Sequence, residues 1–267
     1  MRPSHWLKNS FVLAPAVFGL RFADPAIWPS LFLAVAAFCL AASATYLVND
    51  VVDQEADRHN PRTRSRPVAS GELAPRRALT IAAILVLAAF ALAWRAGCVS
   101  SLAAYAATSF GYSLLFKRVV FLDVASLASL YVVRLLAGAQ AAQVPPSPWL
   151  LLCGGTLALL LAFGKRLERP DTHYSPRFLR LGVDALTVAT FLAYGAYSSQ
   201  ETTRHTFSSW FLLTDLPVAL GLWRYRCLAR AGQADPSQAF FRDRGLQAAT
   251  LLWGVMVVLF ALDMLGW

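Results

Sequence analysis

Charged residues are scarce in this chain of 267 residues, and their scarcity decides its broad class. Asp, Glu, Lys and Arg make up 15% of the sequence, whereas hydrophobic residues make up 57%. A soluble domain usually carries about 25% charged residues. The mean hydropathy is +0.51, and apolar runs of about 20 residues, the length that crosses a bilayer as a helix, recur along the chain. The composition excludes an ordinary soluble domain and predicts a protein that spans the membrane several times.

The sequence also lacks the cysteine patterns of disulfide-linked and zinc-binding proteins. No Cys-x-x-Cys pair and no Cys/His cluster with the spacing of metal ligands occurs. The four cysteines are far apart: Cys39, Cys98, Cys153 and Cys227. Most lie within apolar segments, so we interpret them as small buried hydrophobic residues.

Nine apolar segments divide the chain, and we expect all of them to be helical because lipid offers no partner for backbone hydrogen bonds. They cover approximately 10–22, 27–48, 77–95, 98–116, 120–141, 148–165, 183–199, 207–227 and 246–265. The sequence therefore predicts one all-α integral membrane domain over residues 1–267, with about nine transmembrane helices.

The basic residues are placed unevenly around these segments. The net charge is +9, and almost all cations lie at the N-terminus and in alternate loops. By the positive-inside rule the N-terminus and these loops are cytoplasmic, and the C-terminus lies outside a plasma or inner membrane. The excess of cations suits anionic lipid headgroups or an anionic substrate. Nucleic acid is not expected as a partner, because the basic residues lie in short loops between spans.

Three aspartates follow the second apolar segment at helical spacing. Steps of three and four residues place Asp50, Asp53 and Asp57 on one helix face. Crowded carboxylates repel one another unless a cation lies among them, and charges at the mouth of a membrane helix are costly. A solvated acidic helix end is the alternative, but it does not account for the arginine-rich stretch that follows. The pattern favours Mg²⁺ held by the aspartates, with basic residues on substrate phosphates.

The basic stretch 58–71 has the composition of a loop, with two prolines and a glycine. A positive-inside loop accounts for several of its arginines. Arg58 is the first candidate for a phosphate contact because it follows Asp57 directly, and Arg66, just before Pro67, is the second.

The motif Asn49-Asp50-x-x-Asp53-x-x-x-Asp57, followed by Arg66-Pro67-x-x-x-Gly71, resembles the first signature of the UbiA superfamily of intramembrane prenyltransferases. The resemblance covers nearly the whole chain and implies a helical fold around a central cavity. Within the superfamily, the chain is similar to the branch of decaprenyl-phosphate phosphoribosyltransferases. The similar stretches are 2–9, 112–117, 163–166 and 242–247.

This resemblance implies a reaction, a cofactor and a set of site residues. Members of the branch transfer 5-phosphoribose from phosphoribosyl diphosphate to a polyprenyl (decaprenyl) phosphate, towards arabinan of the cell wall. Asp50, Asp53 and Asp57 are then the expected Mg²⁺ ligands and catalytic residues. The expected substrate-binding residues are Lys8, Asn49, Arg58, Arg66, Tyr112, Lys117, Lys165 and Arg166.

The loop after the sixth apolar segment departs from the aromatic prenyltransferases of the superfamily, which have a second aspartate cluster there. Here the loop carries the cations Lys165, Arg166 and Arg169. Its acidic residues lack repeated spacing; they are Glu168, Asp171 and Asp184. Cations suit a donor and an acceptor that bring additional phosphates. The departure favours phosphoribosyl transfer over prenyl transfer to an aromatic acceptor, and it makes a second Mg²⁺ cluster doubtful.

Two further points stay open at this level. A membrane transporter also carries intramembrane charges, but here they gather at one mouth and no inverted repeat is apparent. Asp123 and Arg134 lie in the fifth apolar segment, near one face and some three turns apart, so they pair either with each other or with other helices. A homo-oligomer is one alternative for the assembly state.

Overall fold

The computed structural model describes residues 3–61, 63–116, 119–168 and 174–264. Every regular element within these ranges is a helix, as the sequence predicts. The chain forms two compact units: residues 1–16, 21–117 and 133–145 make the first, and residues 17–20, 118–132 and 146–267 make the second. Lys117, Arg169 and Asp171 lie outside the described residues.

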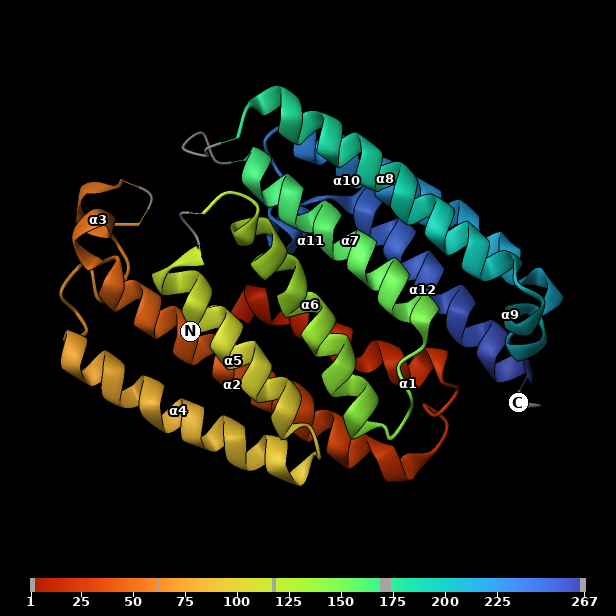
Figure 1. Ribbon diagram of the computed structural model, residues 1–267, viewed down its shortest axis with the longest axis horizontal. Helices are drawn as coiled ribbons and strands as arrows, with labels where there is room; N and C mark the ends of the chain where they lie inside the picture. Colours follow the sequence, from red (N-terminus) through yellow and green to blue (C-terminus); the bar gives the residue numbers. More distant parts are fainter. Residues whose placement is uncertain (1–2, 62, 117–118, 169–173, 265–267) are drawn as a thin grey trace. The chain divides into compact units, whose positions relative to one another are not determined.

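The first unit is built on one long helix. The element order is η1 (Pro3–Leu13), the start of α1 (Ala14–Phe18), η2 (Pro25–Ile27), α2 (Trp28–Val52), α3 (Gln54–His59), α4 (Pro75–Arg95), α5 (Val99–Leu114) and the end of α6 (Leu122–Ala141). α2 packs against α4, α5 and η1 (Figure 1). α4 buries alanines spaced by whole turns, among them Ala78, Ala82 and Ala89. Small side chains on one face let two helix backbones approach closely in lipid.

The end of α6 also approaches the N-terminal element closely. A Cβ atom at Gly138 would lie 1.9 Å from the carbonyl oxygen of Val12 and 3.1 Å from the Cδ atom of Pro15. Only glycine leaves room for this contact, which fixes η1 against α6.

The second unit contains the start of α6 and the C-terminal helices. These are α7 (Pro148–Leu167), α8 (Pro176–Ser199), α9 (Glu201–Thr206), η4 (Ser209–Thr214), α10 (Asp215–Arg230), α11 (Pro236–Arg242) and α12 (Arg244–Met264). α10 packs on α7, α8 and α12, and α7 packs on α8 (Figure 1). The core between them includes Leu160, Val183 and Leu222, with Tyr225 donating a hydrogen bond to the carbonyl oxygen of Ala234 at 2.9 Å.

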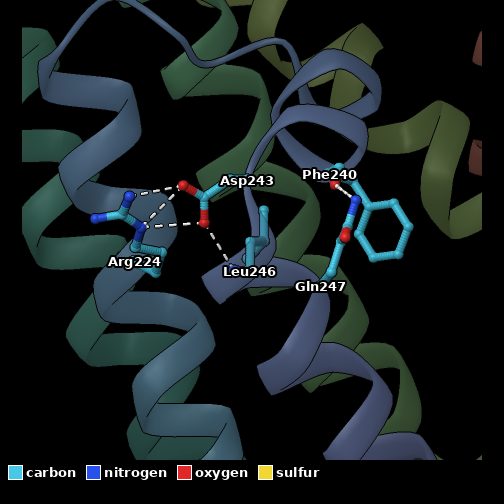
Figure 2. Close-up of polar contacts among 5 residues, drawn as sticks. All are labelled: Arg224, Phe240, Asp243, Leu246 and Gln247. Atoms are coloured by element: carbon cyan, nitrogen blue, oxygen red, sulfur yellow. Dashed lines mark hydrogen bonds and ion pairs between the residues drawn. The ribbon is translucent and has the colours of Figure 1, made fainter.

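A polar corner joins α10, α11 and α12 (Figure 2). Arg224 holds the Asp243 carboxylate through Nε at 3.0 Å and Nη2 at 2.7 Å, and the same carboxylate accepts the backbone N–H of Leu246 at 2.8 Å. Gln247 donates to the carbonyl oxygen of Phe240 at 2.8 Å. Asp243 therefore caps α12 and ties it to α10, so the similar stretch 242–247 has a structural role here.

Six of the described helices are long and apolar enough to cross a membrane. They are Pro25–Val52, Pro75–Arg95, Leu122–Ala141, Pro148–Leu167, Pro176–Ser199 and Arg244–Asp263. The other three predicted segments coincide with shorter elements: η1 with α1, the 16-residue α5, and η4 with the 16-residue α10. The count of nine spans is therefore not confirmed. The single domain over residues 1–267 also stays a prediction.

Candidate functional site

The aspartate segment lies where α2 gives way to α3. Asp53 leaves helical geometry with φ −94° and ψ 11°, and this break separates the two helices. The backbone N–H of Asp53 still donates to Asn49 at 2.8 Å, and that of Asp57 donates to Asp53 at 2.8 Å. The four-residue hydrogen-bond step thus continues across the break. The aspartates follow one another on successive turns, as the spacing predicts, although the helix is not continuous.

Arg66 brings two of these aspartates together. Its Nη1 atom lies 2.6 Å from Asp57 Oδ2 and 3.4 Å from Asp50 Oδ1. Both carboxylate side chains are about one-tenth exposed, at 10% and 11%, whereas the Arg66 side chain is 28% exposed. Two nearly buried carboxylates therefore converge on one cationic group that solvent can reach.

The turn segment after α3, residues 60–61 and 63–74, positions Arg66. Gln54 donates to the carbonyl oxygen of Val68 at 3.3 Å, and Arg58 Nε donates to that of Ala69 at 3.3 Å. Both Val68 and Ala69 are buried. Gly71 has φ +87°, a left-handed conformation that glycine adopts without strain. These contacts give a physical reason for the Arg-Pro-x-x-x-Gly spacing: the segment folds back on α3 and presents Arg66 to the aspartates.

Arg58 has a different environment from the one that we expected. Its Nη1 atom lies 2.8 Å from Glu55 Oε1, and its side chain is 44% exposed. Its contacts with Ala69 and Glu55 hold the turn segment and the surface of α3. The structure places Arg66, rather than Arg58, beside Asp50 and Asp57, and phosphate contacts of both arginines stay predictions. Adjacency to Asp57 in the sequence was a weak guide, since neighbouring residues of a helix point in different directions.

The donor set fits a divalent cation that is completed by a ligand. Among the described residues, no group of three His, Cys, Asp or Glu side chains is arranged to hold a metal ion. Mg²⁺ in proteins is commonly held by one or two carboxylates together with substrate phosphates and water. Asp50 and Asp57 already converge on a cation, the Arg66 guanidinium, and so match that pattern. Asp53, half-buried at the helix break, stays a predicted ligand.

The remaining candidates of the first unit are spread over three elements. Asn49 is half-buried on α2, one residue before Asp50. Lys8 is half-buried on η1, which packs against α2, and Tyr112 is half-buried in the last turn of α5. Their roles in substrate binding stay predictions.

Arg166, in the second unit, is engaged by a carboxylate. Its Nε atom lies 2.6 Å from Asp123 Oδ2, and both side chains are less than one-tenth exposed. Tyr174 donates a hydrogen bond to Asp123 Oδ1 at 2.7 Å and accepts one from the backbone N–H of Phe121 at 2.5 Å. Burial raises the pKa of the Tyr174 phenol, and the hydrogen bond to Asp123 raises it further. Asp123 thus holds Arg166 on one side and Tyr174 on the other.

Sequence reasoning missed this network in part. It named Arg166 as a phosphate ligand and left the partner of Asp123 open, and it did not consider Tyr174. A carboxylate in the first turn of an apolar helix was the available signal, because such a charge requires a partner. The half-buried Lys165 precedes Arg166 in the last turn of α7, and its phosphate contact stays a prediction.

Arg134 pairs with other elements of the first unit. Its Nε atom donates to Asn9 Oδ1 at 2.8 Å, and its Nη2 atom donates to the Tyr105 hydroxyl at 3.3 Å. Asn9 in turn donates to Cys39 Sγ at 3.1 Å. The network joins η1, α2, α5 and α6. It answers the open question on Asp123 and Arg134, since each of them binds other parts of the chain.

The sequence matches a known family model. The model of the UbiA prenyltransferase family matches residues 12–251. The chain belongs to the UbiA prenyltransferase family. It is accordingly a transferase, and its apolar helices make it a multi-pass membrane protein.

Curated relatives include phosphoribosyltransferases and aromatic prenyltransferases. Decaprenyl-phosphate phosphoribosyltransferase of Mycobacterium tuberculosis is 31% identical over 95% of this chain and 90% of its own length. The enzyme of the same name from Corynebacterium glutamicum is 30% identical over 97% of this chain and 84% of its own. A 4-hydroxybenzoate octaprenyltransferase from Polaromonas sp. is 31% identical over 83% of this chain and 77% of its own.

Solved structures confirm the fold. A UbiA homologue from Archaeoglobus fulgidus, bound to GPP and Mg²⁺, superposes with a TM-score of 0.74 at 13% identity, covering 100% of this chain and 98% of that one. A homologue from Aeropyrum pernix gives a TM-score of 0.74 at 18% identity, covering 97% and 98%. The all-helical UbiA fold predicted from the sequence is confirmed.

Proposed function

We propose that this enzyme transfers 5-phosphoribose from phosphoribosyl diphosphate to a polyprenyl phosphate such as decaprenyl phosphate, with Mg²⁺ as cofactor. The observation that carries the proposal is the convergence of the buried Asp50 and Asp57 carboxylates on one cation at 3.4 and 2.6 Å. Identity of about 30% with decaprenyl-phosphate phosphoribosyltransferases over nearly the whole chain supports the choice of substrates.

The chemistry needs positioning more than proton transfer. The lipid phosphate is already anionic, so one of its oxygens forms a bond to C1 of the ribose without a general base. The bond from C1 to the diphosphate breaks, and the diphosphate leaves with its electron pair. Mg²⁺ would neutralise charge on that leaving group. Asp50 and Asp57, with Asp53 as the predicted third ligand, would hold the cation in place.

Attack opposite the leaving group gives inversion at C1. The transition state then has the character of an oxocarbenium ion, which nearby carboxylates and the departing diphosphate stabilise. The contribution of the chain is to align the two substrates and to fix charge around them.

The cations named from the sequence are the proposed contacts for the remaining phosphate oxygens. Donor and acceptor together bring a diphosphate, a 5-phosphate and a lipid phosphate. Guanidinium and ammonium groups suit such oxygens, the former through paired donors and the latter as a point charge. Arg66, with a solvent-accessible guanidinium beside the aspartates, is the foremost of these residues.

Prenyl transfer from a prenyl diphosphate to an aromatic acceptor is the second candidate. The identity with the Polaromonas octaprenyltransferase favours it. Against it, the last turn of α7 carries Lys165 and Arg166, and Asp123 pairs with Arg166 at 2.6 Å. The Asp123 carboxylate is thus already engaged by a cation of the chain.

The proposed location follows from the distribution of charge. The N-terminus and the Asp-rich site face the cytoplasm of a plasma or inner membrane, and the C-terminus lies outside. The polyprenyl chain reaches the site from the bilayer. The product is a polyprenylphosphoryl phosphoribose, proposed as a precursor of cell-wall arabinan.

A direct test incubates the purified protein in lipid nanodiscs with phosphoribosyl diphosphate, decaprenyl phosphate and Mg²⁺. Mass spectrometry of the lipid fraction should detect a phosphoribosylated lipid in equimolar amount with released diphosphate. Chelation of divalent cations should abolish the product. Diphosphate release without a phosphoribosylated lipid would contradict the proposed acceptor.

A further inference from the structure

We propose that Arg66 is a displaceable counter-cation: it neutralises Asp50 and Asp57 when no metal is bound, and it moves to the diphosphate when the metal binds. The first half rests on the geometry of the carboxylates alone. The second half rests on the proposed function, because it requires a diphosphate donor.

Arg66 and a divalent cation compete for the same atoms. The guanidinium lies 2.6 Å from Asp57 Oδ2 and 3.4 Å from Asp50 Oδ1, and these two carboxylates are the ones that would hold the metal. The guanidinium brings one positive charge to these carboxylates, whereas a divalent cation brings two. A divalent cation balances both carboxylates and is therefore the better partner for them once it is present.

The attachment of Arg66 allows its side chain to move while its backbone stays fixed. Its carbonyl oxygen accepts the backbone N–H of Ser70 at 2.8 Å. The neighbouring Val68 and Ala69 are buried and bound to side chains of α3. The guanidinium, in contrast, is at the end of a long flexible stem and is partly exposed. Displacement therefore requires only a change of rotamer, without rearrangement of the turn segment.

The exchange gives Arg66 opposite effects on two ligands. Without a donor, Arg66 blocks the metal, so its removal should tighten metal binding. With a diphosphate present, the displaced guanidinium is free to donate paired hydrogen bonds to phosphate oxygens. Its removal should then weaken diphosphate binding. If the role of Arg66 were purely structural, its removal would weaken the binding of the metal and of the diphosphate together.

The first measurement titrates Mn²⁺, without any donor, into the purified protein and follows the loss of the free Mn²⁺ signal by electron paramagnetic resonance. Arg66→Gln should bind Mn²⁺ at least about fivefold more tightly than the unmodified protein, because a charge-assisted contact no longer competes. The matched control is Arg64→Gln, which removes the same charge from an exposed position of the same turn segment. It should change the affinity by less than about twofold, because exposed charges are screened.

The second measurement titrates inorganic diphosphate at saturating Mn²⁺. Arg66→Gln should weaken diphosphate binding by about tenfold, through loss of charge-assisted hydrogen bonds. Arg64→Gln should weaken it by less than about threefold. Arg66→Lys keeps the charge but loses the planar fork, so its Mn²⁺ affinity should lie between those of the unmodified protein and Arg66→Gln. If Arg66→Gln does not fold, Arg66→Lys tests the proposed exchange in its place.

Unchanged or weaker Mn²⁺ binding by Arg66→Gln would overturn the inference, and so would equal tightening by Arg64→Gln. The Mn²⁺ titration needs neither donor nor acceptor. Failure to transfer phosphoribose would therefore contradict the proposed function and leave the competition between Arg66 and the metal intact. Transfer by a protein whose Mn²⁺ affinity does not depend on Arg66 would contradict the exchange alone.

Discussion

Individual residues of the Asp-rich segment were predictable to different degrees. The spacing of Asp50, Asp53 and Asp57 predicts a shared face, because helical geometry is local and independent of the rest of the fold. The partner of that face was not predictable in the same way. Arg66 reaches Asp50 and Asp57 only because the turn segment folds back through contacts to Gln54 and Arg58, and a motif does not reveal such a path.

Substitution of Asp50 tests whether this single residue acts as a metal ligand. Asp50→Asn should lower Mg²⁺-dependent phosphoribosyl transfer on the order of 100-fold, since a metal ligand and the charge stabilisation that it supports are lost. Glu55→Gln is the matched control, because Glu55 lies in the same segment but is 75% exposed and pairs with Arg58. Steady-state rates of lipid phosphoribosylation check both variants. Activity of Asp50→Asn close to that of the unmodified protein would remove Asp50 from the site.

Lys165 gives a second prediction at this scale. Lys165→Ala should raise the apparent KM for phosphoribosyl diphosphate about tenfold, because a charge-assisted phosphate contact is lost. The measurement varies the donor and the lipid acceptor separately. If only the KM for the lipid acceptor changes, Lys165 contacts the other substrate.

At the scale of the elements, the apolar runs gave the positions of the helices better than their ends. α8 begins at Pro176, whereas the apolar run begins at 183. The earlier start follows from its cap, because the Ser175 side chain accepts the backbone N–H of Phe178 and Pro176 occupies the first turn. Segment 207–227 divides into η4 and α10. Hydropathy detects membrane-facing composition and does not register caps or changes of helix type.

The corner of α10, α11 and α12 supplies a prediction with a defined pH dependence. The Arg224 side chain, which donates hydrogen bonds to Asp243, lowers the pKa of that carboxyl. The pKa is thus lower in the folded state than in the unfolded state. The corresponding stability is present above the unfolded pKa and is lost as the pH falls through the folded pKa. The unmodified protein should exceed Asp243→Asn in melting temperature at pH 7, and the difference should shrink below about pH 4.

Asp243→Ala separates the cap from the ion pair. Asparagine still accepts the N–H of Leu246, whereas alanine does not, so the alanine variant should lose about 1 kcal/mol more. Thermal melts in detergent, followed by tryptophan fluorescence, compare the two variants. Equal stability of both variants across the pH range would show that the cap contributes nothing.

Tyr174 gives a prediction for the segment that leads into α8. Its hydroxyl links Asp123 to the backbone N–H of Phe121, at 2.7 and 2.5 Å. Tyr174→Phe leaves the buried Asp123 carboxylate and the backbone N–H of Phe121 without this partner, and it should cost about 1–3 kcal/mol of folding stability. Thermal unfolding measures the loss. A melting temperature equal to that of the unmodified protein would contradict the structural role of Tyr174.

At the scale of the whole molecule, fold and family are settled, whereas orientation in the membrane is a prediction. Composition and apolar periodicity predict an all-helical membrane protein, because lipid leaves few alternatives to the helix. The number of spans depends on three short elements: η1 with α1, α5, and η4 with α10. The apolar runs predict that each crosses the membrane, whereas the helices there are shorter than the six candidate spans. Nine spans place the two termini on opposite sides of the membrane.

Reporter fusions test this orientation. An N-terminal reporter should be active in the cytoplasm, and a C-terminal reporter should be active outside, because nine crossings separate the ends. Both termini on the same side would require an even number of crossings. That outcome would remove at least one of the three short elements from the set of spans.

The most direct test of the central claim offers one purified preparation two substrate pairs in Mg²⁺. The first pair is phosphoribosyl diphosphate with decaprenyl phosphate, and the second is a long-chain prenyl diphosphate with 4-hydroxybenzoate. Mass spectrometry of the lipid products decides between them. We expect a phosphoribosylated polyprenyl phosphate from the first pair and no prenylated aromatic acid from the second. A prenylated aromatic acid as the main product would contradict the account.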